Sequence, residues 1–317
     1  MEIIRGLHNL QPLQGGSVAT IGNFDGVHRG HQAIIERIQQ KALELSAPTV
    51  LITFEPYPQE FFAGDKAAAR LMRFREKMER FKELGVDKVL CLRFNAKLAS
   101  LSAEDFIQRI LVQGLQVKHL VVGDDFRFGH QRRGDITLLQ QAARDFGFGL
   151  EDTPTVEYQG QRISSTRVRD ALAKGDCTQM DALLGHHYFL AGRVAHGDKR
   201  GRTIGFPTAN IHLRGKTAPV SGVFAVSVEG IDSAPLGAVA NIGSRPTVDG
   251  IKKLLEPHIL DFSSDIYGRH VKVNFLHFIR AEQRFDSLQA LVAQIEKDSD
   301  QARQWLLENG IAIGKAP

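Results

Sequence analysis

Residues 17–46 read SVATIGNFDGVHRGHQAIIERIQQKALELS. A short β-type run, SVATIG, is followed by a glycine-rich turn and then by apolar residues at helical spacing. The next run, PTVLITF at 48–54, is again typical of a strand. Strand, helix and strand in this order form a βαβ unit, which predicts that the two strands pair in parallel.

The same alternation continues through the first half of the chain. Helical patterns at 75–85, 102–113 and 135–147 each precede a strand pattern, at 86–94, 117–123 and 148–156. Repeated βαβ units place helices on both faces of one sheet. We therefore expect an α/β domain built on a mainly parallel, doubly wound sheet.

The second half of the chain has a different pattern. Short β-type runs follow one another without helices between them, at 188–197, 222–230, 236–243, 254–262 and 269–280. Such a series predicts a small antiparallel β-barrel. A final helical pattern at 287–310 closes at Gly310. We place the domain boundary near Gly185, giving domains 1–185 and 186–317.

Composition limits the possible functions. The 317 residues suit two domains, and 40 Lys and Arg against 36 Asp and Glu give a net charge of +4 that favours anionic ligands mildly. No basic run is interleaved with aromatic residues, and no apolar stretch approaches about 18 residues, so we expect neither a nucleic-acid nor a membrane partner. Cys91 and Cys177 lack CxxC spacing, which suits a reduced protein of the cytoplasm. The sequence does not determine whether the chain self-associates.

The turn after the first predicted strand is the first candidate site. In open α/β sheets ligands bind at the carboxyl ends of the strands, and this turn is the usual place for phosphate. Gly22, Gly26 and Gly30 allow close approach of the backbone, and the next helix favours an anion. His28 and His31, three residues apart, could donate to one phosphoryl group in a transition state. The alternative is that His28 is a turn residue and His31 a surface residue.

Two further segments of the first half carry suitable groups. ISSTRVR at 163–169 offers hydroxyls and charge at a helix start, as a phosphate clamp or as ordinary N-capping; its candidate residues are Ser164, Ser165, Thr166 and Arg169. The segment VVGDDFRFGHQRRGD at 121–135 follows a strand and contains Asp125. Aspartate is also common in turns, so Asp125 is either a site residue or a turn former.

The second half contains GDKRGRTIGFPTANIHL at 197–213. It lacks the GxxxxGK[ST] pattern of a P-loop, but its glycines, basic residues and hydroxyl suit phosphate binding. Read from composition alone, the segment is a basic turn that enters a strand rather than a binding site. Glu256 lies in LLEPHILDF at 254–262. Read in the same way, it is one polar residue of an alternating strand, and its side chain faces solvent.

The motifs of the first half resemble those of a known superfamily. GNFDGVHRGHQ resembles the HxGH signature of the nucleotidyltransferases, ISSTRVR resembles their ISSTxxR element, and residues 121–135 resemble their VGxDFxFGxxxxGD loop. The resemblance implies a Rossmann-like domain in which His28 and His31 are catalytic. It also implies nucleotide or phosphate binding by Gly22, Asn23, Phe24, Gly26, Gly30, Ser164, Ser165, Thr166 and Arg169, with Asp125 contacting nucleotide or flavin.

GRTIGFPTAN resembles the nucleotide-binding signature of the riboflavin kinase family, whose fold is a small antiparallel barrel. The resemblance implies that Thr208 and Asn210 help hold Mg²⁺ and the ATP phosphates, which suits a hard cation with oxygen ligands. It implies nucleotide binding by Gly201, Arg202, Gly205 and Pro207. LLEPHILDF resembles the family's ExHxxD stretch, and its glutamate, Glu256, is the expected general base.

The order of the two modules is similar to that of the bacterial bifunctional riboflavin kinase/FAD synthetases, and the resemblance covers nearly the whole chain. It implies ATP-dependent phosphorylation of riboflavin to FMN in the second domain, and adenylyl transfer from ATP to FMN, giving FAD and pyrophosphate, in the first. One alternative is a transferase for another acceptor, such as phosphopantetheine or a pyridine mononucleotide. The other is a flavin-binding module without catalytic activity.

Overall fold

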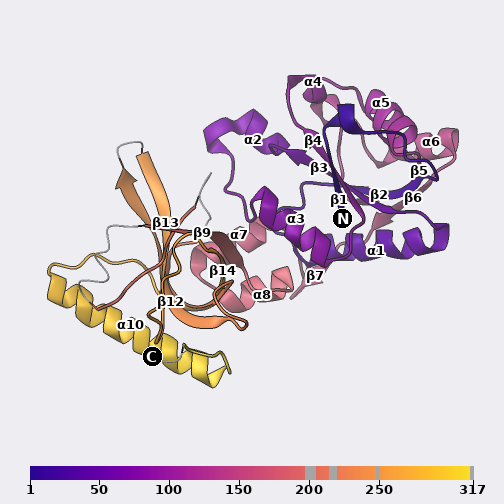
Figure 1. The fold of residues 1–317 in the computed structure, drawn as a ribbon. Helices are drawn as coiled ribbons and strands as arrows, with labels where there is room; N and C mark the ends of the chain where they lie inside the picture. The colour runs from indigo at the N-terminus through magenta and orange to yellow at the C-terminus, as the bar shows by residue number, and fades with distance from the viewer. Residues whose placement is uncertain (197–204, 214–219, 248–249, 315–317) are drawn as a thin grey trace. The chain divides into compact units, whose positions relative to one another are not determined.

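The computed structural model describes residues 1–196, 205–213, 220–247 and 250–314 (Figure 1). They form two compact units, one of Met1–Ala68 with Met72–Ser164 and the other of Ala69–Leu71 with Ser165–Pro317. The division therefore lies at Ser164, whereas the sequence pattern places a domain boundary near Gly185. The boundary at 185 stays a prediction.

The first unit is built on a six-stranded sheet in which every pair of neighbours is parallel, as predicted. In spatial order the strands are β1 (Glu2–Arg5), β4 (Lys88–Arg93), β3 (Thr49–Glu55), β2 (Ser17–Ile21), β5 (Val117–Gly123) and β6 (Gly149–Thr153). The edge strand β1 is not among the predicted strands, because four mostly exposed residues carry little periodic signal.

Helices and short helical turns connect these strands. They are η1 (Leu7–Asn9), α1 (Arg29–Leu45), α2 (Pro58–Ala63), η2 (Gly64–Lys66), α3 (Phe74–Glu83), α4 (Ala96–Ala99), α5 (Ala103–Phe106), the π-helical η3 (Ile107–Gly114), η4 (His130–Arg132) and α6 (Ile136–Phe146). A small hairpin follows, of β7 (Glu157–Tyr158) and β8 (Gln161–Arg162).

Both faces of the sheet are covered, which makes it doubly wound. Ala19 and Ile21 of β2 pack with buried residues of α5, η3 and α6 on one face, whereas Val18 packs with Ile38 and Ala42 of α1 on the other. All five residues of β2 are buried, so this strand occupies the centre of the core. The turn after β2 therefore follows a fully buried strand in the middle of the sheet.

The second unit contains a closed six-stranded barrel whose neighbours all pair antiparallel, as predicted. In spatial order its strands are β10 (Asn210–His212), β13 (Gly250–Ile259), β12 (Leu236–Thr247), β11 (Gly222–Glu229), β14 (His270–Arg280) and β9 (Phe189–Ala195). Closure leaves no long unpaired strand edge, which stabilises a small β domain.

Within the described residues the barrel is accompanied by the helices α7 (Ser165–Lys174), α8 (Cys177–Leu184) and α10 (Leu288–Glu308). Ala302 and Leu306 of α10 pack on apolar residues of the barrel strands, and Gly310 follows the helix at φ +70°, so the predicted C-terminal helix is confirmed.

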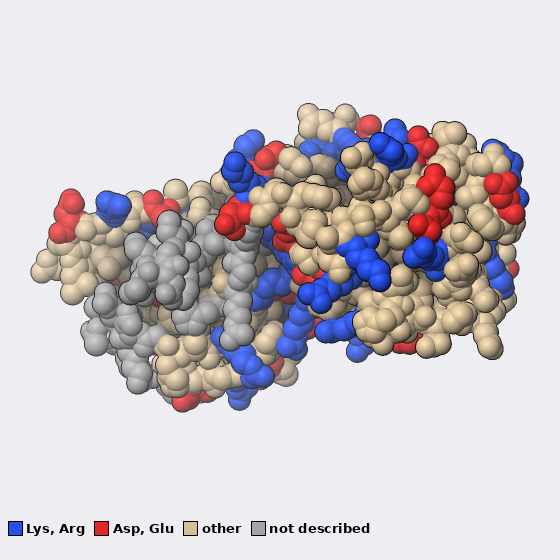
Figure 2. Space-filling view, turned by 90° about the horizontal axis from the view of Figure 1, so that it is seen from above, with Lys and Arg blue, Asp and Glu red and all other residues tan. Residues whose placement is uncertain are grey.

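Side chains of both charge signs lie interspersed on the face shown in Figure 2, which agrees with the modest net charge. Among the described residues, no helix is both long and apolar enough to cross a bilayer.

Candidate functional sites

The loop between β2 and α1 has an unusual backbone. Phe24 and Val27 adopt φ values of +51° and +42°, and Gly26 adopts +83°. Positive φ is strained for a β-branched residue, and such strain persists only where surrounding contacts hold it. A Cβ at Gly22 would lie 3.0 Å from the Phe24 ring, so this glycine lets the ring fold back over the backbone. The loop is thus held in one conformation at the end of the central strand.

Phe24 connects the loop to the elements around it. Its buried ring lies 5.0 Å from the His31 ring and 5.7 Å, edge-on, from Phe81 of α3 (centroid distances). Phe24 therefore acts as a packing residue beside the histidines, which adds a structural role to its predicted place in the site.

His28 and His31 lie together at the start of α1. His28 is the N-cap residue, and its Nδ1 accepts a hydrogen bond from the His31 amide at 3.4 Å. The two rings stack at 3.6 Å and 15°. Because Nδ1 is an acceptor, the proton of neutral His28 is on Nε2. A Cβ at Gly30 would lie 3.3 Å from the His28 ring, so glycine leaves room for the cap.

Both histidines are held neutral. Burial lowers the pKa of His28 to about 4, with a smaller contribution from the Arg162 guanidinium. Burial lowers the pKa of His31 well below its ordinary value, followed by the effects of His28 and Lys77. At neutral pH the pair therefore consists of uncharged N–H donors, which can polarise an anionic group without forming an ion pair.

The second motif begins next to the first within the same unit. A Cβ at Gly30 would lie 3.8 Å from the carbonyl oxygen of Ile163. Nη2 of Arg162 bonds Asp125 Oδ1 at 2.9 Å and Asp124 Oδ1 at 3.1 Å, so the β7–β8 hairpin is tied to the loop after β5. Asp125 is exposed and already engaged by this arginine; its contact to nucleotide or flavin stays a prediction.

The remaining clamp residues lie on either side of the division between the units. Ser164 ends the first unit, whereas Ser165, Thr166 and Arg169 belong to α7 of the second. Nε of Arg169 donates to the Ala69 carbonyl oxygen at 2.7 Å, which gives this arginine a structural bond. Phosphate binding by these four residues stays a prediction.

A buried polar cluster beside the histidine loop was not found from the sequence. Lys77 of α3 is 0% exposed, and its Nζ donates to the Asn23 carbonyl oxygen and to Thr53 Oγ1, each at 2.9 Å. Asp25, 4% exposed, accepts from the Tyr57 hydroxyl at 3.3 Å. The one available signal was a lysine on the apolar face of a predicted helix, which more often extends its amine to solvent.

The second candidate site lies where β10 and β13 pair. Ile211 is opposite Leu255, and the Ala209 amide donates to the Pro257 carbonyl oxygen at 2.9 Å. This register sets Asn210 beside Glu256, and residues opposite one another in an antiparallel pair share a face. The structure thus brings together two candidate residues that lie far apart in the sequence.

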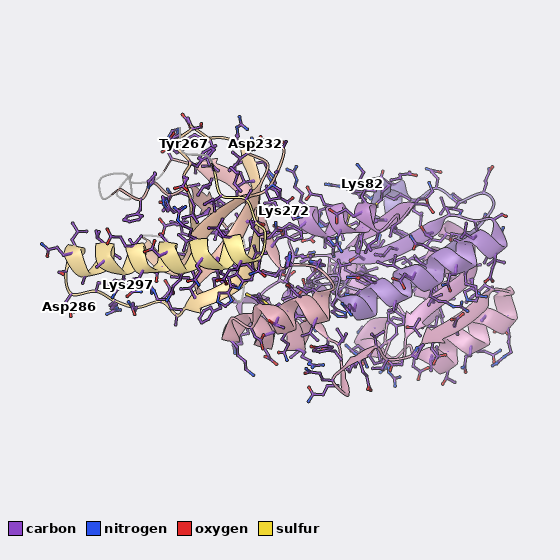
Figure 3. All side chains as sticks on the ribbon, turned by 90° about the horizontal axis from the view of Figure 1, so that it is seen from below. Lys82, Asp232, Tyr267, Lys272, Asp286 and Lys297 are labelled. Atoms are coloured by element: carbon purple, nitrogen blue, oxygen red, sulfur yellow. The ribbon has the colours of Figure 1, made fainter. Side chains whose placement is uncertain are left out.

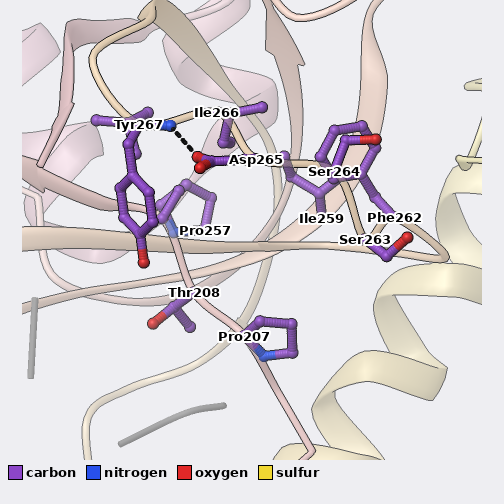
Figure 4. A pocket seen from close by; sticks show the side chains of 12 residues that line it. Pro207, Thr208, Pro257, Ile259, Phe262, Ser263, Ser264, Asp265, Ile266 and Tyr267 are labelled. Carbon is purple, nitrogen blue, oxygen red and sulfur yellow. Dashed lines mark hydrogen bonds between the residues drawn. The ribbon is translucent and has the colours of Figure 1, made fainter. Parts of the chain in front are cut away.

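A pocket of about 200 Å³ adjoins this pair of strands (Figure 4). Thr208 lines it, together with Pro207, Pro257 and Tyr267. The amide of Tyr267 donates to Asp265 Oδ1 at 2.9 Å, which shapes the turn over the pocket. Glu256 is not among the lining residues. It is half-buried rather than freely solvent-facing.

Of the other residues predicted for this site, Gly205 and Pro207 lie in the described part of the chain. Gly205 adopts φ +88°, a conformation that favours glycine, and the Pro207 carbonyl oxygen lies 2.9 Å from His258 Nδ1. Gly201 and Arg202 lie outside the described residues. No cluster of three or more His, Cys, Asp or Glu side chains suited to a metal occurs in the described part of the chain.

Comparison with known proteins identifies two families along the chain. The FAD synthetase family model matches residues 10–167, and the riboflavin kinase model matches residues 184–306. Bifunctional riboflavin kinase/FMN adenylyltransferases of Escherichia coli K12 and Pseudomonas fluorescens are 53% and 52% identical to this chain. Each alignment covers 96% of this chain, with 98% of the first relative and 97% of the second.

A solved structure has the same two-part architecture. It is a Streptococcus pneumoniae protein described as a macrolide-efflux protein, 32% identical, with a TM-score of 0.84 over 96% of this chain and 100% of that one. Its descriptive name differs from those of the curated relatives.

Proposed function

Because this chain belongs to the bifunctional riboflavin kinase/FMN adenylyltransferase family, we propose that the loop after β2 is its adenylyl-transfer site and the β10–β13 region its kinase site. The FAD synthetase match coincides with the Rossmann-like unit, and the riboflavin kinase match contains the barrel. The observation that carries the first assignment is the stacked, neutral His28–His31 pair at the start of α1.

Adenylyl transfer joins an FMN phosphate oxygen to the α-phosphorus of ATP while the α–β bridging P–O bond breaks and pyrophosphate leaves. The FMN phosphate is ionised at neutral pH, so the site needs no general base. It needs donors fixed toward the α-phosphoryl oxygens, where negative charge gathers. The Nε2–H of His28 fits this requirement, because its Nδ1 is occupied by the backbone.

Riboflavin phosphorylation joins the ribityl 5′-oxygen to the γ-phosphorus of ATP, and ADP leaves. In this proposal Glu256 accepts the hydroxyl proton, as a carboxylate does in phosphoryl transfer. The oxygens of Thr208 and Asn210 would hold Mg²⁺, since a hard cation accepts neutral oxygens and retained waters. When bound, the ion neutralises phosphate charge. Glu256 lies beside Asn210 in register, which supports placing base and nucleotide together.

The test is a chromatographic time course of riboflavin, FMN and FAD with the full chain, ATP and Mg²⁺. Wild-type protein should form FMN and then FAD, and His28→Ala should halt at FMN. His8→Ala, an exposed histidine in the first unit, is the matched control and should resemble wild type. If His28→Ala still forms FAD at the wild-type rate, the assignment of the adenylyl-transfer site is wrong. Flavin binding without conversion would instead favour the binding-module alternative.

A further inference from the structure

Lys77, the buried lysine of α3, contacts the loop between β2 and α1. Lys77 is wholly buried, although a lysine is rarely buried without partners. Its Nζ bonds the Asn23 carbonyl oxygen of the 22–28 loop and Thr53 Oγ1 of β3. Its ammonium also lies 4.6 Å from the centroid of the Tyr57 ring, within cation–π range.

This lysine connects four parts of the first unit. It belongs to α3, it bonds the loop and β3, and it contacts Tyr57, which precedes α2. Tyr57 in turn donates to Asp25, and the Met72 amide donates to the same carboxylate oxygen at 3.2 Å. The loop between β2 and α1, which has no regular secondary structure, is therefore bonded through Lys77 and Asp25 to α3, to β3 and to the residues Tyr57 and Met72.

The loop needs such support because its backbone is strained. Phe24 and Val27 are non-glycine residues at positive φ, and Val27 directly precedes His28, the residue that caps α1. A strained conformation of this kind lasts only when its surroundings determine it. Asn23 lies next to Phe24, so the bond to its carbonyl acts at the first strained position.

We infer that Lys77 is a positioning residue for adenylyl transfer: its buried ammonium ties the Asn23 carbonyl to β3 and so holds the loop that presents His28 and His31. The inference rests on the proposed function of that loop. Lys77 touches no reacting atom in this scheme and acts through the histidines. Its positive charge also acts on His31 and helps keep that ring neutral.

The experiment measures kcat and KM for FAD formation from ATP and FMN, with FMN formation from riboflavin measured on the same preparations. Lys77→Met should lower kcat for FAD formation at least tenfold and change each KM less than about threefold, since misplaced donors affect mainly the transition state. FMN formation should be unchanged. Lys82→Met is the control, because Lys82 is an exposed lysine of the same helix (Figure 3).

Thr53→Val tests the link to β3. This change removes one partner of Lys77 and also the Thr53 hydroxyl, which donates to the Asn23 carbonyl oxygen at 3.4 Å. It should therefore lower kcat for FAD formation in the same direction as Lys77→Met and leave FMN formation unchanged. Circular dichroism must show that each variant is folded at the assay temperature. If Lys77→Met is not, Lys77→Gln replaces it under the same tenfold criterion. A kcat for FAD formation within twofold of wild type in the lysine variant, or an equal loss of FMN formation in that variant, would overturn the inference.

The same assays distinguish an error in the proposed adenylyl-transfer site from an error in the role of Lys77. If His28→Ala keeps FAD formation, the loop is not the site, whatever Lys77 does. If His28→Ala loses FAD formation and the lysine variant keeps it, only the role of Lys77 is rejected.

Discussion

Replacing His28 by asparagine should remove a specific pH dependence from the stability of the first unit. Asparagine is also a strong N-cap residue, so His28→Asn retains an acceptor for the His31 amide. It does not titrate. The variant therefore separates protonation of the buried imidazole from its capping role.

The size of the effect follows from the lowered pKa. His28 is 6% exposed, and its pKa falls from 6.5 to about 4 on folding. As the pH falls below 6.5, the His28 imidazole binds a proton in the unfolded chain but stays neutral in the folded chain. The free energy of unfolding therefore decreases between pH 6.5 and 4. At pH 5.5 the unfolded imidazole is about nine-tenths protonated, and the cost to the folded state is about 1.4 kcal/mol.

Urea unfolding at pH 7.5 and 5.5 measures this cost. Circular dichroism reports the whole chain, whereas Trp305, the only tryptophan, lies in α10 and reports the second unit. Between the two pH values, the wild type should lose about 1.4 kcal/mol more than His28→Asn. His8→Asn should behave as wild type. Equal pH dependence in wild type and His28→Asn would refute the neutral, buried state of His28.

Three further substitutions give separate outcomes. His31→Ala should reduce FAD formation by about 10²–10³-fold and leave FMN formation intact in the chromatographic assay; an equal loss of both products would contradict the division of labour. Glu256→Gln should do the reverse, with FAD still formed from supplied FMN, and full kinase activity in this variant would reject the proposed base. Arg280→Ala breaks a bidentate pair with Asp298, which is 3% exposed, and should cost about 3–5 kcal/mol in urea unfolding followed by Trp305 fluorescence; a loss below about 1 kcal/mol would show that the pair behaves like a surface ion pair.

The sequence alone determined the class of each unit, because the decisive signals are local. The strand patterns at 17–22 and 48–54 flank one amphipathic helix, and parallel pairing follows from that order. The short strand runs after 188 carry no helical periodicity, so a barrel was predictable as well. His28 and His31 were found for the same reason: a glycine-rich turn between a strand and a helix pattern, and a spacing of three, are both visible within ten residues.

Only the tertiary structure decided the properties that depend on distant neighbours. The sequence shows two histidines but not that burial keeps both neutral, because desolvation depends on what packs around them. It shows Asn210 and Glu256 but not the strand register that sets them side by side. Lys77 has the appearance of a surface lysine until α3 docks on β3, since its two partners lie 54 and 24 positions away in the chain. Local patterns depend on neighbouring residues, whereas burial, strand register and charge environment depend on residues that come into contact only in the folded chain.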